Sequence, residues 1–244
     1  MSNNKSSNNL VLIFISQVLI ASLLIFIYHK YIIEKPHILE TGNNSFTSQI
    51  SRPSLDTKTD YIHPTASIIG KVFIGHSVFV APQASIRGDE GTPIYIGNKA
   101  NIQDGVVIHA LETEEHGETI KNHLLEEHKL HKKFAVYIGN KVSLAHQSQV
   151  HGPAIIEDNT FIGMQAFVFN SVIEENCVIE PAAVVIGVHI PKNHYVKAGS
   201  IINSQALADA LPLISEDYEY KNINKAVVNV NSQLATTYNK KYGY

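Results

Sequence analysis

The segment IGNKVSLAHQSQVHGPAIIEDNTFIGMQAFV, residues 138–168, decides the fold, because an aliphatic side chain returns at every sixth position. A helix would repeat its apolar residues at a spacing near 3.6, and a half-buried strand would alternate them at two. A hexapeptide period is instead typical of a parallel β-helix, in which each unit is one short strand and one turn. The inward positions in this segment are Ile138, Leu144, Val150, Ile156, Ile162 and Val168.

The same step of six continues on both sides of this segment. It runs back through the residues before position 111 and forward to position 202, after a slip of phase that follows residue 168. Because one hexad cannot bury its apolar face alone, successive coils must stack on one another. The further inward positions expected are Ile62, Ile68, Ile74, Val80 and Ile86, then Ile96, Ile102 and Ile108, and after the slip Val172, Val178, Val184, Ile190, Val196 and Ile202.

The fold is therefore predicted to be mainly β, with a parallel β-helix of hexapeptide repeats over 61–203 and an insertion loop at 111–135. Residues 204–244 leave the ladder and are expected to be helical. Ser204 is a candidate cap for a short helix, and a longer helix is expected from about Asp217 to Tyr238. An amphipathic helix must bury its apolar stripe, most simply by packing alongside the β-helix. That stripe is expected to be Ala226, Val227, Val230 and Leu234.

An apolar stretch without charged residues, 10–28, precedes the repeat. A helix of this length spans about 28 Å, which is close to the hydrocarbon core of about 30 Å. No small-residue cleavage pattern follows the stretch, so an uncleaved anchor is favoured over a cleaved signal peptide. We therefore expect an N-terminal hydrophobic helix within 1–28 that acts as membrane anchor or signal segment, and a linker over 29–60. The protein is accordingly expected to be extracytoplasmic, membrane-anchored or secreted.

Composition argues against nucleic-acid binding and excludes an intrachain disulfide. The chain of 244 residues has a net charge of −3 and 17% charged residues, with no basic patch interleaved with aromatic residues. Nucleic-acid binding is therefore not expected. The single cysteine, Cys177, excludes an intrachain disulfide and is interpreted as a small buried side chain.

Three histidines occupy positions in the ladder that suit a metal site. His109 and His151 each follow an inward aliphatic residue directly, so they are expected to project from one face of stacked coils. His146 lies two places after Leu144 and is expected to point from another face or corner. Three imidazoles with an open position for water are the ligand set of a catalytic zinc site. Since these phases do not converge within one chain, they predict a head-to-tail homotrimer, with His109 and His151 from one subunit and His146 from the next.

Three segments of the chain resemble the γ-class carbonic anhydrases, most closely the archaeal prototype of the class. They are RGDEG at 87–91, NIQDGVVIHALE at 101–112 and VSLAHQSQVHGP at 142–153, and the similarity covers roughly 61–235. The resemblance implies a left-handed β-helix homotrimer with a C-terminal helix and Zn²⁺ at the subunit interfaces, with Fe²⁺ or Co²⁺ as alternatives. It also implies reversible hydration of CO₂ to bicarbonate and a proton by a metal-bound hydroxide.

The resemblance assigns a role to residues in each of these segments. His109, His146 and His151 match the metal ligands of the family. Gln103 matches the residue that hydrogen-bonds the metal-bound water or bicarbonate. Glu90 matches the carboxylate beside the metal-bound hydroxide.

Further roles follow from the same resemblance at the rim of the site. Glu112, at the start of the insertion, matches the proton shuttle, and Asn231 matches a residue that orients CO₂. Arg87 and Asp104 match a pair that ties subunits together at the interface. Asn229 departs from the pattern, because the prototype carries an aromatic residue there. This departure puts the hydrogen-bond network around the hydroxide in doubt, but not the ligand set.

Two other functions share the expected scaffold. A hexapeptide-repeat acyltransferase would use a histidine as general base, bind an acyl-CoA and need no metal, whereas two histidines five apart with His109 in phase favour metal. A catalytically silent structural trimer is the other alternative, and the presence of Glu90, Gln103 and Glu112 argues against it. Glu90 and Glu112 also have plainer interpretations, an interface ion pair and a solvated loop charge.

Overall fold

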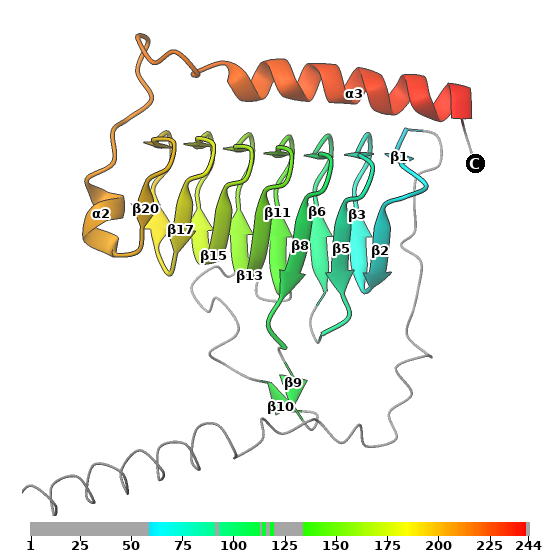
Figure 1. Ribbon diagram of the computed structural model, residues 1–244, viewed down its shortest axis with the longest axis horizontal. Coiled ribbons are helices and arrows are strands. Elements are labelled where there is room, and N and C mark those ends of the chain that lie inside the picture. Colours follow the sequence, from blue (N-terminus) through cyan, green and yellow to red (C-terminus); the bar gives the residue numbers. More distant parts are fainter. Residues whose placement is uncertain (1–58, 91–92, 113, 116–117, 120–133, 243–244) are drawn as a thin grey trace, which may run out of the picture. The chain divides into compact units, whose positions relative to one another are not determined.

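The computed structural model describes residues 59–242, except 91–92, 113, 116–117 and 120–133. The chain divides into two compact units, Met1–Ser45 and Phe46–Tyr244, and all described residues belong to the second. In that unit the chain winds as a parallel β-helix with a long helix alongside it (Figure 1). The prediction of a mainly β, parallel β-helix with a C-terminal helix is therefore confirmed.

The first face of the β-helix is a seven-stranded parallel sheet. Each strand pairs with the strand one coil away, so inward aliphatic residues lie in line: Ile62 pairs with Val80, and Val80 pairs with Ile102. The strands, in order, are β1 (Tyr61–Ile62), β4 (Phe79–Val80), β7 (Asn101–Ile102), β12 (Ser143–Leu144), β14 (Phe161–Ile162), β16 (Val178–Ile179) and β19 (Tyr195–Val196).

The second and third faces form one continuous sheet, because two long strands, β13 (Gln149–Ile156) and β15 (Phe167–Ile173), take part in both. The second face also contains β2 (Ser67–Gly70), β5 (Ser85–Gly88), β8 (Val107–Ala110), β17 (Val184–Ile186) and β20 (Ile201–Ile202). The third face also contains β3 (Val72–Ile74), β6 (Ile94–Ile96), β11 (Val136–Ile138) and β18 (His189–Ile190). The expected insertion contributes a small antiparallel pair, β9 (Glu114–Glu115) and β10 (Glu118–Thr119), and its residues 120–133 lie outside the described part.

The core is the aliphatic ladder that the sequence predicts as far as residue 168. The expected side chains from Val80 to Val168 are essentially inaccessible to solvent, and the three before Val80 are partly buried against them. Beyond residue 168 the prediction is wrong by one residue at three positions. The coil steps by five rather than four or six after Val168, so the residues that align with the earlier ladder and are buried in the core are Ile173, Ile179 and Val185, in place of Val172, Val178 and Val184.

Two helices follow the last coil. The expected short helix is α2 (Gln205–Asp209), with Ser204 at its N-cap position but without a side-chain cap bond. The expected long helix is α3 (Ile223–Tyr242), which runs along the first face and contacts β1, β4, β7 and β12 (Figure 1).

The buried stripe of α3 differs from the expected one. Its buried residues are Asn224, Val228, Asn231 and Ala235, at helical spacing. Ala226 and Val230 of the expected stripe are exposed, whereas Val227 and Leu234 do pack on the β-helix. Asparagines replace hydrophobic residues in the stripe because they bond to backbone: the Asn224 side-chain amide donates to the Lys141 carbonyl (2.9 Å).

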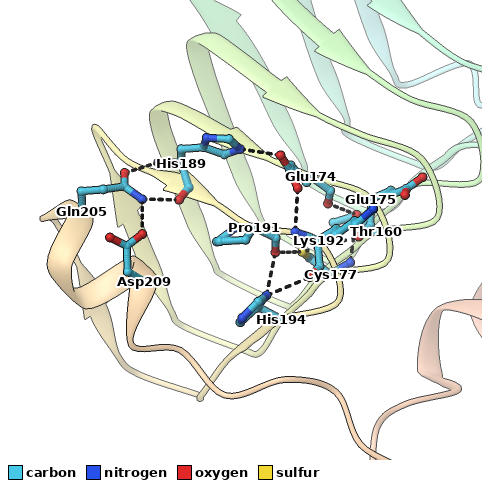
Figure 2. A network of polar contacts seen from close by, with 10 residues as sticks. All are labelled: Thr160, Glu174, Glu175, Cys177, His189, Pro191, Lys192, His194, Gln205 and Asp209. Carbon is cyan, nitrogen blue, oxygen red and sulfur yellow. Dashed lines mark hydrogen bonds and ion pairs between the residues drawn. The ribbon is translucent and has the colours of Figure 1, made fainter.

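A set of polar contacts, which we call the C-terminal coil network, fixes α2 to the last coils (Figure 2). The Gln205 side chain accepts a hydrogen bond from the His189 backbone N–H (3.0 Å) and donates to the His189 carbonyl (2.8 Å) and to Asp209 (2.8 Å). The His189 ring meets Glu174 at 2.8 Å, and the other carboxylate oxygen of Glu174 accepts the Lys192 backbone N–H (2.8 Å). Every member of this network therefore has a partner.

The expected extracytoplasmic, membrane-anchored or secreted location is corrected. Across the described ranges of the chain, no helix combines the length and the apolar character needed to cross a bilayer. The longest of these helices, α3, carries asparagine and lysine side chains along its length. The segment 10–28, on which the expectation rested, lies outside the described residues, as does the proposed hydrophobic helix within 1–28.

Two expectations stay predictions. One is the left-handed sense of the coil. The other is the division of the chain at 1–28, 29–60, 61–203 and 204–244, whose first two parts lie almost wholly outside the described residues.

Candidate active site

His109 and His151 lie side by side on the second face. The parallel register of β8 and β13 pairs the two residues directly, and their ring centroids are 5.3 Å apart at an interplanar angle of 85°. Both rings point outward, because the preceding residues, Ile108 and Val150, fill the core. The shared phase in the sequence therefore places both imidazoles at one spot on the surface of the β-helix.

Two carboxylates border this pair. The chain leaves β5 at Gly88, and β5 is the neighbour of β8, so the residues after it lie next to His109. The His109 Nε2 atom is 3.3 Å from a Glu90 oxygen and 3.6 Å from Asp89 Oδ1. Arg87 approaches both acids, at 3.0 Å from Asp89 Oδ2 and 3.6 Å from Glu90. The sequence reasoning missed Asp89, although it stands beside Glu90 in the same motif.

Unsatisfied polar atoms gather in this cluster. Within the described residues, four buried side-chain atoms have no hydrogen-bond partner, and two of them are His109 Nε2 and Asp89 Oδ1. Buried polar atoms are normally hydrogen-bonded, so such atoms require an explanation, and the binding of an ion or a ligand is one. One ligand atom each from Asp89, Glu90 and His109 lie within 4.8 Å of one another, a spacing that a metal ion could bridge.

The tautomer of His151 is set by its own backbone. Its Nδ1 atom lies 3.1 Å from the Gly152 carbonyl oxygen. Since a carbonyl oxygen only accepts, Nδ1 carries the proton and the lone pair is on Nε2. A metal-binding histidine is oriented in the same manner, through its second ring nitrogen.

His146 lies apart from the other two histidines, at the turn after β12. Its Nδ1 atom is 3.0 Å from an Asp104 carboxylate oxygen, and its side chain is 56% exposed, against 16% for His109. The carboxylate accepts the Nδ1 proton, so the exposed ring presents Nε2 as its free lone pair. The structure therefore puts the third expected ligand on a different part of the surface, as its phase predicts.

A groove of about 870 Å³ lies beside His146, between α3 and the first face of the β-helix. Gln103, Asp104 and Asn231 line it together with His146, and Tyr61 and Tyr238 are among its apolar and aromatic neighbours.

Gln103 and Asn231 in the groove wall are held by hydrogen bonds. Gln103 is 8% exposed and donates to Asn101 (3.0 Å), which in turn donates to Ser143 (2.8 Å). Asn231 is 9% exposed and donates to the Val227 carbonyl (2.9 Å). Both amides are thus fixed in place at the wall.

The structure thus separates the predicted site residues into two groups. One group, on the second face, contains Arg87, Glu90, His109 and His151, and the other lines the groove. Arg87 and Asp104 belong to different groups and do not pair with each other in the chain.

Two predicted residues belong to neither group. Glu112 follows the end of β8 and is partly buried. Asn229 is exposed on the other side of α3 and lines a separate groove with Lys141 and Asn159. The departure at Asn229 therefore lies away from His146 in the chain.

Comparison with known proteins identifies the family. No protein-family model matches the chain. A carbonic anhydrase of Methanosarcina thermophila is 53% identical over 84% of this chain and 82% of its own length. The carboxysome assembly protein CcmM of a Nostoc species is 39% identical over 73% of this chain but 30% of its own length, and the mitochondrial gamma carbonic anhydrase 1 of Arabidopsis thaliana is 29% identical over 66% and 54%. The chain belongs to the γ-class carbonic anhydrases, a family of carbonate dehydratases.

Proposed function

We propose that the protein catalyses the reversible hydration of CO₂ to bicarbonate and a proton, at sites shared between the subunits of a left-handed β-helix homotrimer. The observation that supports this proposal is the separation of the histidines. His109 and His151 form a pair on the second face, whereas His146 is displayed at the groove. In a head-to-tail ring, one surface of each subunit meets a different surface of the next. Each contact would then join the pair of one subunit to His146 of its neighbour.

The donor atoms fit Zn²⁺, with Fe²⁺ or Co²⁺ as alternatives. His109 offers a buried Nε2 atom without a hydrogen bond. His151 and His146 are each held through Nδ1, by Gly152 and Asp104, so their Nε2 lone pairs are free to bind a cation. When bound, such a metal would acidify a water molecule and so supply hydroxide for attack on CO₂.

Protons would leave the site through carboxylates of the second face. Glu90 is 3.3 Å from His109 Nε2 and is the acid nearest to this ligand atom. Arg87 fixes the neighbouring Asp89 and approaches Glu90, so it orients both carboxylates. Glu112, at the start of the insertion, would carry the proton on to solvent.

The groove residues would position the substrate. CO₂ carries no net charge, and the groove offers it an apolar wall that includes Phe79 and Val230. Gln103 uses its amide N–H to bind Asn101, so its carbonyl oxygen can accept a hydrogen bond from water or bicarbonate. Asn231 has a second amide hydrogen beyond the one that it donates to Val227, and this hydrogen would orient CO₂. Across the same contact, Arg87 of one subunit would pair with Asp104 of the next.

A metal held within one chain is the competing arrangement. Asp89, Glu90 and His109 are close enough to share a cation. However, the Arg87 guanidinium already binds Asp89 Oδ2 at 3.0 Å, and its positive charge opposes a second cation at the same acids. The shared site of three imidazoles is therefore favoured.

Subunit complementation separates these arrangements. Chains with His109→Ala and chains with His146→Ala are each expected to lack bound metal and activity. Mixed in equal amounts, unfolded and refolded together, they should recover about one quarter of the wild-type sites, because one site needs His109 from one subunit and His146 from the next. Stopped-flow CO₂ hydration and metal content are measured on the same samples.

The matched control mixes His109→Ala chains with His151→Ala chains. Both residues belong to the same subunit's pair, so no mixture of these chains completes a site and no activity should return. Full metal content in His146→Ala alone would instead support the single-chain arrangement. Hydration that persists after removal of metal by a chelator, or an acyl-CoA-dependent activity without metal, would contradict the proposed function.

A further inference from the structure

We propose that His63 relays protons between the groove and solvent during turnover, as a second exit beside Glu112. This inference rests on the proposed function. It is carried by the place of His63 in the wall of the same groove as Gln103, His146 and Asn231. His63 lies outside the motif segments around the expected ligands.

His63 and Gln103 stand in one row of the β-helix. His63 follows β1, Ala81 follows β4 and Gln103 follows β7, and the backbone N–H of each donates to the strand of the next coil, at 2.9, 2.8 and 3.0 Å. Two rungs of about 4.8 Å therefore separate the His63 and Gln103 backbones by roughly 10 Å. The row leads from the amide that faces the substrate to an imidazole near the start of the β-helix.

The space along this row is open. The residue between the two is alanine, whose side chain is too short to fill the groove, and Pro82 lines the groove beside it. The groove of about 870 Å³ has room for many waters, since each takes about 30 Å³ of liquid volume. A chain of waters can thus connect Gln103 and His146 with His63.

The surroundings of His63 suit a group that gains and loses a proton. The ring is half-buried, and its Nδ1 atom accepts the Thr65 backbone N–H (3.2 Å) and lies 2.9 Å from the Thr65 hydroxyl. The neutral ring therefore carries its proton on Nε2. A proton that arrives at Nδ1 forms the imidazolium, whose Nδ1–H can hydrogen-bond to the Thr65 hydroxyl oxygen. Loss of the Nε2 proton to solvent then gives a neutral ring.

The balance of this relay is one proton in and one proton out, which leaves the neutral ring with its proton on Nδ1. Exchange of ring protons with solvent water then returns the proton to Nε2 before the next turnover. Imidazole is the side chain whose unperturbed pKa, about 6.5, allows both steps near neutral pH. The titratable groups that line the same groove are Asp104, His146, Tyr61, Tyr238 and Tyr242.

Steady-state kinetics on the full chain tests the relay. We expect His63→Gln to lower kcat at low buffer concentration about threefold, and about tenfold in a Glu112→Gln background, because proton export limits kcat in weak buffer. The value of kcat/KM, which reports CO₂ hydration itself, should not change, and added imidazole should restore kcat. The exposed His76 lies outside the groove, and His76→Gln is the matched control.

A second readout does not depend on activity. In the metal-free chain, nitrogen NMR of the neutral His63 ring, assigned by comparison with His63→Gln, should show the proton on Nε2 and the lone pair on Nδ1. Unchanged kcat in weak buffer, a neutral ring with its proton on Nδ1, or a loss of kcat/KM that imidazole does not restore, would overturn the relay. If the wild-type chain shows no metal-dependent hydration, the proposed function fails, and the relay fails with it.

Discussion

Histidine and carboxylate side chains lie close together in two regions of the β-helix. The two regions differ in how many of their polar atoms are hydrogen-bonded. In the C-terminal coil network, the His189 ring is 2.8 Å from Glu174, and both Glu174 oxygens accept hydrogen bonds (Figure 2). In the cluster around His109, the distances from the ring to the acids are 3.3 and 3.6 Å, and His109 Nε2 makes no hydrogen bond. The same residue types therefore form a closed network in one region and an open cluster in the other.

This difference indicates that the polar cluster around His189 stabilises the fold, whereas the cluster around His109 is suited to bind a ligand. A bonded pair contributes to the free energy of unfolding, whereas a buried atom without a partner lowers it by its desolvation penalty, about 1–3 kcal/mol. Such atoms are kept where function requires them. The comparison predicts that substitutions near His109 change activity more than stability, and that substitutions near His189 do the reverse.

The largest effect is expected for His109→Ala. Activity and metal content should fall by more than about 100-fold, because even a partner of a metal ligand typically contributes 10- to 100-fold. The free energy of unfolding of the metal-free protein should change by less than about 1 kcal/mol, because removal of the unbonded Nε2 atom and loss of the ring contact with His151 act in opposite directions. Urea unfolding, metal analysis and CO₂ hydration check the three quantities.

His189→Ala is the matched control for this substitution. It should keep metal and activity while it lowers the free energy of unfolding, because its ring has a bonded partner. If His109→Ala and His189→Ala both lowered the free energy of unfolding equally and both kept activity, the distinction between the two clusters would be contradicted.

The next effect is expected for Asp104→Asn. The Asp104 carboxylate lies 3.0 Å from His146 Nδ1, and its loss weakens both the orientation and the basicity of the imidazole. Metal affinity should fall about 10-fold, near the lower limit for such partners, because the asparagine oxygen still accepts a hydrogen bond. Competition titration with a chelator measures the affinity, and Asp209→Asn, in the C-terminal coil network, should leave it unchanged.

The core could be predicted from the sequence as far as the step of six residues is kept, which is up to Val168. The residues on either side of Leu144, Ser143 and Ala145, are small, so the inward position is unambiguous there. Beyond residue 168 the strands contain two adjacent aliphatic residues, such as Val178 and Ile179, and a six-residue count cannot say which of them faces inward. The structure buries Ile179 in the core and uses Val178 to pack against the helical segment outside.

The separation of the histidines was predictable because phase along a β-helix fixes direction. The partners of the ligands were harder to predict, because their contacts join adjacent coils that are far apart in sequence: β7 pairs with β12, so Asp104 and His146 are neighbours in space although they are 42 residues apart. The groove could not be predicted, because its outer wall depends on which side of α3 faces the β-helix. The buried stripe of α3 was expected one residue away from its observed position. Amide side chains such as Asn231 are not recognised as part of a packed stripe by hydrophobicity alone.

A smaller effect is expected for Glu174→Gln. Burial alone would raise the pKa of Glu174, but the Lys192 backbone N–H and the His189 ring hold the pKa below its ordinary value of 4.5. At pH 7 the variant should lose about 1 kcal/mol in the free energy of unfolding, a modest value because the His189 side chain is 45% exposed. Activity should not change.

The pH dependence of this contribution has a defined sign. Since the pKa is lowered in the folded state, the stabilisation is fully present above pH 4.5 and is lost as the pH falls through the folded pKa. The difference in unfolding free energy between wild type and Glu174→Gln should therefore shrink in urea titrations as the pH falls below 4.5 and through the folded pKa. A difference that grows on acidification would contradict the bonding of Glu174 described above.

The smallest effect is expected at Cys177, which lies beside the C-terminal coil network and bonds to Pro191 (Figure 2). The thiol is fully buried and donates to the Pro191 carbonyl (3.1 Å), and burial raises its pKa to about 12. Because the thiolate is the reactive form, an aromatic disulfide reagent at pH 8 should not label the native protein, but should label it fully in urea. Rapid labelling of the native protein would show that the coil around Cys177 opens readily. That result would contradict the conclusion that hydrogen bonds hold the C-terminal coil network closed.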